Sequence, residues 1–189
     1  MKEYVTLANA LTSGSLVAGF FAVLLIFRGE YYPAAGLILL AAIFDILDGA
    51  AARHSDNGNE AFGTNLDSLA DVVSFGAAPA LALYMSSLYA LPVFGIAASL
   101  VFFLCGAWRL ARFSTCKNPL YFVGCPIPGA GVLVAGLAAF GAPPLVALPA
   151  ALVLGVLMIG TMPFPTLSGL RNREELSEVV EEYRQTRNA

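Results

Sequence analysis

The chain has 189 residues, of which 58% are hydrophobic and only 12% are charged, and its mean hydropathy is +0.76. A typical soluble domain is about 45–50% apolar and about 25% charged. This composition excludes an ordinary soluble enzyme, a disordered chain and a nucleic-acid-binding domain. The net charge of −3 is small, so the positions of the few charges are more informative than their sum.

Three long segments, residues 4–27, 72–108 and 118–170, contain no Asp, Glu, Lys or Arg. Because a membrane-spanning helix needs about 20 apolar residues, these segments predict an all-α, polytopic membrane protein. Stretches rich in Gly, Pro or polar residues divide the apolar sequence into separate helices. The six expected transmembrane helices cover residues 5–27, 33–54, 62–86, 91–113, 127–141 and 144–161.

The distribution of Lys and Arg predicts the orientation in the membrane. When the connecting loops are assigned alternately to the two sides, nine of the ten basic residues fall on one side and only Arg28 on the other. Basic residues are enriched in cytoplasmic loops. Both termini are therefore expected to be cytoplasmic, as are the loops after the second and fourth helices.

The domain organisation follows from the same pattern. Residues 1–170 are expected to form one transmembrane domain, and residues 171–189 a charged cytoplasmic tail. Four apolar residues of the tail recur at helical spacing and predict a short amphipathic helix. These are Leu176, Val179, Val180 and Tyr183.

Four aspartates stand inside the expected second and third helices. Asp45 and Asp48 are three residues apart, and Asp67 and Asp71 are four apart, so each pair occupies one helix face. An ionised aspartate at membrane depth costs about 2.5–3.5 kcal/mol even on a lenient insertion scale, and such residues are usually functional. Four of them on neighbouring helices need a compensating positive charge.

Carboxylate oxygens are the ligands that Mg²⁺, Mn²⁺ and Ca²⁺ prefer. Four aspartates could hold two such ions, an arrangement suited to phosphoryl transfer. The structural alternative is a set of salt bridges to Arg53, Arg109 and Arg112. These would neutralise three of the four charges, but they do not explain the small residues that accompany the aspartates.

The small residues Gly49, Ala52 and Gly63 lie on the same helix faces as the aspartates and would let a ligand approach the backbone. The segment from Asp45 to Asp71 resembles the signature of the CDP-alcohol phosphatidyltransferases, which reads DxxDGxxAR, a spacer and GxxxDxxxD. Every specified position is present. The spacer has nine residues here, where eight is commonest.

Members of that family transfer a phosphatidyl group from a CDP-linked lipid to an alcohol and release CMP. The resemblance implies that Asp45, Asp48, Asp67 and Asp71 bind two cations, Mg²⁺ or Mn²⁺. It implies Asp71 as the general base, with metal-assisted deprotonation as the open alternative. It also implies CDP-diacylglycerol or CDP-archaeol as the donor, surrounding membrane lipids, a homodimer and no nucleic-acid partner.

Residues on the first three helices are expected to bind the CDP-lipid. The sequence Asn9-Ala-Leu-Thr12 resembles the family's NxxT motif near the nucleotide, with Ala8 where Pro is usual. Ordinary hydrogen bonding between helices is the alternative role for Asn9 and Thr12. The full set of expected CDP-lipid contacts is Asn9, Thr12, Asp48, Gly49, Ala52, Arg53, Gly63 and Asp67.

A second region bears on the acceptor alcohol. Residues 105–114 and 122–130 resemble the RLARFN and FxGLPIPAA segments of the integral-membrane phosphatidylserine synthases within that family. Departures from the pattern occur at Ser114, Cys125 and Gly129. The resemblance implies L-serine as the acceptor.

Arg109 and Arg112 are three residues apart at the cytoplasmic end of the fourth helix, where they could clamp the serine carboxylate. The same pair could hold glycerol 3-phosphate or inositol phosphate, or anchor the helix by snorkelling.

The sequence therefore predicts an integral cell-membrane enzyme, with its active site at the cytoplasmic face, that transfers a phosphatidyl or archaetidyl group to L-serine. One alternative is the same chemistry on a phosphorylated acceptor. The other is a divalent-cation transporter. Transport is disfavoured because the aspartates lie near one face and the last two expected helices are almost purely apolar.

Overall fold

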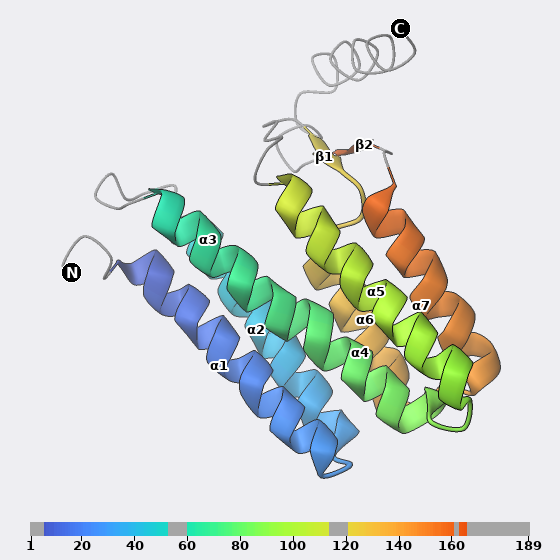
Figure 1. Cartoon of the computed structure of the whole chain (residues 1–189). Helices are drawn as coiled ribbons and strands as arrows, with labels where there is room; N and C mark the ends of the chain where they lie inside the picture. The colour runs from blue at the N-terminus through green and yellow to red at the C-terminus, as the bar shows by residue number, and fades with distance from the viewer. Residues whose placement is uncertain (1–5, 53–59, 114–120, 161–162, 166–189) are drawn as a thin grey trace, which may run out of the picture.

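The computed structural model describes residues 6–52, 60–113, 121–160 and 163–165. In these ranges the chain is folded almost entirely as helix (Figure 1). The helices are α1 (Leu7–Phe27), α2 (Tyr31–Ala52), α3 (Glu60–Asp71), the π-helical turn η2 (Val72–Ala77), α4 (Ala78–Leu83), the π-helical turn η3 (Tyr84–Leu88), α5 (Pro92–Phe113), α6 (Ile127–Ala139) and α7 (Pro144–Ile159).

The helical segments agree with the six expected ranges to within two residues at each end. Four of them are long and apolar enough to cross a membrane, and α6 and α7 are shorter apolar helices of 13 and 16 residues. The prediction of a helical, integral membrane protein is confirmed. The expected tail at residues 171–189 lies outside the described residues.

Two local features were not predicted. The third expected helix is not a regular α-helix, because two π-helical turns interrupt the span Ala61–Leu88. The first of these turns has a physical reason in Pro79, whose ring would clash with the carbonyl four residues earlier in a regular helix. The second feature is a short antiparallel pair, β1 (Tyr121–Val123) with β2 (Pro163–Pro165).

Local sequence explains where α1 begins and ends. The Thr6 hydroxyl accepts a hydrogen bond from the Asn9 backbone N–H at 3.1 Å, which caps the first turn of α1. Gly29 then adopts a φ of +77° in the tight turn to α2. This left-handed conformation is accessible to glycine at little cost.

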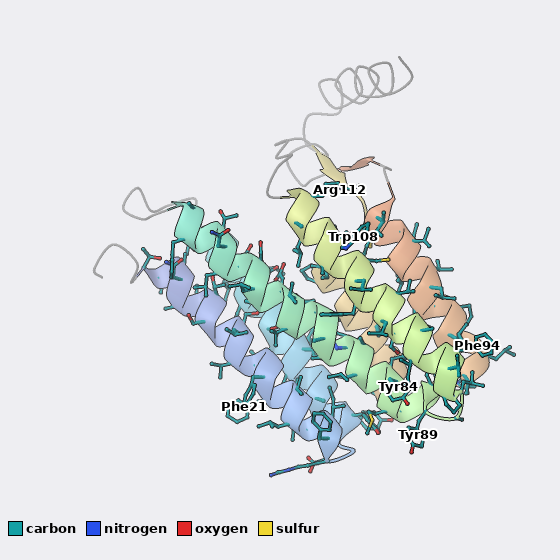
Figure 2. The ribbon with its side chains drawn as sticks, in the orientation of Figure 1. Phe21, Tyr84, Tyr89, Phe94, Trp108 and Arg112 are labelled. Atoms are coloured by element: carbon teal, nitrogen blue, oxygen red, sulfur yellow. The ribbon has the colours of Figure 1, made fainter. Side chains whose placement is uncertain are left out.

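The helices pack through small residues. α1 packs along α2, α5 packs along α7, and α6 contacts both α2 and α4 (Figure 1). The buried core is rich in alanine, including Ala22, Ala34 and Ala41, which lets helix backbones approach closely. Large apolar side chains such as Phe94 and Trp108 are instead 70% exposed and project outward, as a lipid-facing surface requires (Figure 2).

The last turn of α7 is held by residues from two other segments. The backbone N–H of Cys125 donates to Leu157 O at 3.0 Å, and the Arg112 guanidinium donates to Ile159 O and Gly160 O at 3.1 and 3.3 Å. The last carbonyls of a helix have no partner within it. These bonds therefore give partners to carbonyls that have none within α7.

Gly124 lies beside the same carbonyls and has a φ of +87°, and a Cβ there would overlap Met158 O. We expect Gly124→Ala to destabilise the protein by about 1–2 kcal/mol for the left-handed backbone and a further ~1–3 kcal/mol for the overlap. Gly29→Ala is the matched control, because Gly29 has a φ of +77° but nothing within 4 Å. Thermal unfolding in detergent micelles should give the lower midpoint for Gly124→Ala, and equal midpoints would contradict the overlap.

Candidate functional site

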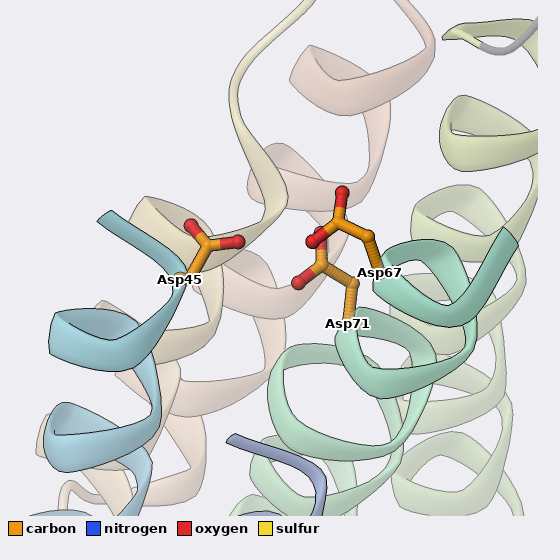
Figure 3. A group of neighbouring side chains, drawn as sticks. All are labelled: Asp45, Asp67 and Asp71. Atoms are coloured by element: carbon orange, nitrogen blue, oxygen red, sulfur yellow. The ribbon is translucent and has the colours of Figure 1, made fainter. Parts of the chain in front are cut away.

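Three carboxylates meet between α2 and α3. Asp45 lies on α2, and Asp67 and Asp71 lie one turn apart on α3, so that their side chains point toward one another (Figure 3). One carboxylate oxygen of each lies within 4.8 Å of those of the other two. Asp71 is buried and the other two are half-buried. The carboxylates of α2 and α3 therefore converge on one site, and both helices pack against α1.

Asp48 lies almost one turn further along α2 and is also buried. It is not one of the three clustered carboxylates, although its charge acts on both Asp45 and Asp71. Its Oδ2 accepts a hydrogen bond of 2.6 Å from the Thr12 hydroxyl of α1, and the Gly49 backbone N–H also donates to it. The fourth predicted aspartate is thus oriented by α1.

Asn9 of α1 and Gly63 of α3, which were also expected to bind the CDP-lipid, lie close together. Asn9 is buried, and a Cβ at Gly63 would come within 3.2 Å of Asn9 Oδ1. Gly63 therefore provides space for the Asn9 side chain. Hydrogen bonding between helices, the alternative role considered for Thr12, is realised in its bond to Asp48.

Two residues near the end of α2, which were expected to contact the CDP-lipid, are more exposed. Gly49 is half-buried and Ala52 is exposed. Arg53 lies outside the described residues.

Arg109 of α5 is buried, and its positive charge acts on Asp71 and Asp45. It is one of the salt-bridging arginines considered from the sequence, and the structure places it near the aspartates. Its charge offsets part of the cost of burying the carboxylates.

A cavity of about 390 Å³ opens next to Arg109, between α5 and α7. Trp108 and Arg112, which also line it, lie near the end of α5 that is close to β1 (Figure 2). The remaining lining residues are Ala111 and Ile159.

The second arginine has a contact that spacing did not predict. Arg112 lines the same cavity, but its guanidinium also donates to the carbonyls at the end of α7, as described above. Those carbonyls are 47 and 48 residues away in sequence. No local sequence signal could have indicated this contact.

Cys125 is a further neighbour of the site that sequence reasoning missed. Burial raises the pKa of its thiol, and the positive charge of Arg109 acts in the opposite direction. Cys125 therefore lies near Arg109, at the start of α6. The sequence marked it only as a departure from a motif.

Comparison with known proteins identifies the family to which this site belongs. The family model described as CDP-alcohol phosphatidyltransferase matches residues 5–166. The chain belongs to the CDP-alcohol phosphatidyltransferase family. The match includes all three clustered aspartates, Asp48, and both arginines of α5.

Several relatives within this phosphatidyltransferase family are similar over much of the chain. A CDP-diacylglycerol–serine O-phosphatidyltransferase of Methanocaldococcus jannaschii is 36% identical over 87% of this chain and 76% of its own length. An archaetidylserine synthase of Methanothermobacter thermautotrophicus is 35% identical over 90% of this chain and 74% of its own length. A CDP-diacylglycerol–serine O-phosphatidyltransferase of Helicobacter pylori is 40% identical over 67% of this chain, but the match spans only 54% of that relative.

The donor set of this phosphatidyltransferase site fits a hard divalent cation. All three clustered groups are carboxylates, and Mg²⁺ and Mn²⁺ prefer oxygen ligands. Asp45, Asp67 and Asp71 could therefore hold a metal ion. Thr12 fixes the orientation of the adjacent Asp48, as groups beyond the ligands of a metal site commonly do.

We expect Thr12→Val to weaken Mn²⁺ binding by about tenfold, the lower end of the range for losing such a supporting hydrogen bond. Valine keeps the shape of threonine but cannot donate to Asp48. Thr12→Ser keeps the hydroxyl and should restore the affinity. Isothermal titration of the full chain in micelles gives the affinities.

Ser13→Ala is the matched control for this comparison, because the Ser13 hydroxyl donates to Asn9 O of its own helix. Wild-type affinity in Thr12→Val would contradict a positioning role for Thr12.

Proposed function

We propose that this phosphatidyltransferase transfers the phosphatidyl or archaetidyl group of a CDP-linked lipid to the hydroxyl of L-serine and releases CMP, in phospholipid biosynthesis. The observation that supports the chemistry best is the cluster of Asp45, Asp67 and Asp71 within 4.8 Å, in a chain of this family. The choice of serine is supported by the printed names of the relatives, which are serine phosphatidyltransferases or an archaetidylserine synthase.

In the proposed reaction the serine hydroxyl oxygen attacks the β-phosphorus of the CDP-lipid. The bond from that phosphorus to the bridging oxygen breaks, and the oxygen leaves with CMP. The serine proton passes to a carboxylate oxygen of Asp71, the general base. Asp71 suits this role because the positive charge of Arg109 favours its ionised form, and only the ionised carboxylate can accept a proton.

The charged parts of the reaction require a cation. When bound, Mg²⁺ or Mn²⁺ would neutralise the pyrophosphate and stabilise the leaving oxygen. Asp45, Asp48, Asp67 and Asp71 would hold it, and the four together could hold two ions.

The CDP-lipid is proposed to bind over the adjoining ends of α1, α2 and α3. Asn9 and Asp67 face this region, and Thr12 contributes by orienting Asp48. Gly49, Ala52 and Gly63 have no bulky side chain and would let the CDP-lipid approach the helix backbones, and Arg53, the next residue in the sequence after α2, would supply a positive charge. These assignments come from the family signature and from the positions of the described residues.

Arg109 and Arg112 are proposed to bind the serine carboxylate from the wall of the 390 Å³ cavity. Arg109 lies on the side of the aspartates, and Arg112 lies on the side of α7. A carboxylate bound between them would be held next to the catalytic base. The bonds from Arg112 to α7 would fix its guanidinium in place before serine binds.

The proposed setting of the enzyme follows from charge distribution and from the family. The six helices are proposed to be six membrane spans, with both termini and the active site on the cytoplasmic side. Residues 1–170 form the transmembrane domain, and residues 171–189 form a cytoplasmic amphipathic tail. A homodimer among membrane lipids is proposed as the working assembly.

Purified full-length protein given CDP-diacylglycerol or CDP-archaeol, Mn²⁺ and labelled L-serine should release CMP and form labelled serine lipid. The parallel reactions replace serine with glycerol 3-phosphate or inositol phosphate. Turnover with one of these but not with serine would overturn the acceptor assignment. Uptake of Mn²⁺ into sealed vesicles without any CMP release would favour a transporter.

Asp71→Asn should lower kcat by about 10²–10⁴-fold, the usual contribution of a positioned acid or base. The substitution keeps the size of the side chain but removes its ability to accept the serine proton. Ser68→Ala on the same helix is the control, because the Ser68 hydroxyl bonds to Thr64 O of its own helix. Turnover by Asp71→Asn at the wild-type rate would show that another group is the general base.

Arg109→Gln should raise the KM for serine by about 10–100-fold, since hydrogen bonds to charged groups contribute about 1.5–3 kcal/mol. The KM for the CDP-lipid should change much less. Arg28→Gln removes an exposed positive charge from the far end of α1 and serves as the control. Equal increases of both KM values would argue against a serine clamp.

A further inference from the structure

The backbone changes its geometry immediately after Asp71. α3 ends at this residue, and the π-helical turn η2 begins at Val72. In this turn the Ala78 N–H donates to Val73 O, five residues earlier, rather than to the residue four earlier. Such a turn inserts one extra residue into the helix. It therefore sets the rotation of the aspartate-bearing face of α3 relative to the buried face of α4. π-helical turns inside α-helices often occur at functional sites.

Two neighbouring helices meet η2 through glycines. A Cβ on Gly19 of α1 would lie 2.8 Å from Ser74 Cα, and a Cβ on Gly131 of α6 would lie 2.7 Å from Phe75 O. Any larger residue at either position would push against backbone atoms of η2. Ser74 and Phe75 are both completely buried, so the turn has little space into which it can move.

A hydrogen bond also links η2 to α1. The Ser74 hydroxyl donates to Ser15 O of α1 at 3.0 Å. α1 is also the helix that orients Asp48 of α2 through Thr12. One helix is therefore bonded both to Asp48 of α2 and to the turn that follows the aspartate pair of α3.

We propose that η2, held between Gly19 and Gly131, places Asp71 opposite Asp45, and that Gly19, Gly131 and Ser74 are positioning residues of the phosphatidyl transfer. None of the three belongs to the family signature read from the sequence. The inference rests on the proposed function for its kinetic readout, and on the carboxylate cluster alone for its binding readout.

Gly19→Ala and Gly131→Ala should each lower kcat on the order of 10–100-fold, because a displacement of about 1 Å at a catalytic group costs up to about 10²-fold. The KM for serine should stay within about twofold of wild type. Mn²⁺ affinity, measured by titration of the full chain without substrate, should fall in parallel with kcat.

Gly36→Ala and Gly136→Ala are the matched controls. Each makes the same substitution in a helix, and a Cβ at either position would meet nothing within 4 Å. Gly136 is on the same helix as Gly131, five residues further on. Both controls should keep the kcat and the Mn²⁺ affinity of the wild type.

Ser74→Ala tests the proposal without adding bulk, so it decides the matter if either glycine variant does not fold. It removes only the bond to Ser15 O, and it should lower kcat and Mn²⁺ affinity with a near-normal unfolding temperature.

Two results would overturn the proposal. One is wild-type Mn²⁺ affinity in folded Gly19→Ala and Gly131→Ala. The other is a folded Ser74→Ala with unchanged kcat and Mn²⁺ affinity. Failure of the wild type to use serine would instead refute the proposed function, and the Mn²⁺ titrations would still decide the role of η2.

Discussion

The burial of carboxylates in an apolar helical bundle is the constraint on which the rest of the structure depends. Each ionised aspartate that leaves water must gain a compensating charge or hydrogen bond. Thr12 and Gly49 supply hydrogen bonds to Asp48, and Arg109 supplies a positive charge near Asp45 and Asp71. Four helices, α1, α2, α3 and α5, are thereby tied to one site. The oxygen-rich centre that remains suits a divalent cation.

Close helix packing is the second requirement, because apolar side chains gain little by leaving lipid for another apolar surface. Small residues meet this requirement where backbones and short side chains must touch. Gly63 leaves room for Asn9, and Gly19 and Gly131 leave room for the turn after Asp71. The glycines of this protein therefore have two structural roles. Some admit neighbouring helices, and others, such as Gly124, permit a left-handed backbone.

The end of α7 is tied to two other segments of the chain. Arg112 of α5 and the backbone N–H of Cys125 both donate to the last carbonyls of α7. Arg112 also lines the cavity beside Arg109. The same side chain thus binds the end of α7 and lines the cavity in which serine is proposed to bind.

The helical membrane fold, the helix boundaries to within two residues, and the four aspartates with their family could all be predicted from the amino-acid sequence. These follow from local quantities, namely the length of apolar runs, the spacing of residues on a helix face, and a dense signature. The folded chain was needed to show that Asp48 stands apart from the cluster on a bond to Thr12, and that Arg109 and Arg112 differ in their surroundings. Both features depend on contacts between residues far apart in the chain, and the spacing within one helix contains no information about which residues another helix places beside it.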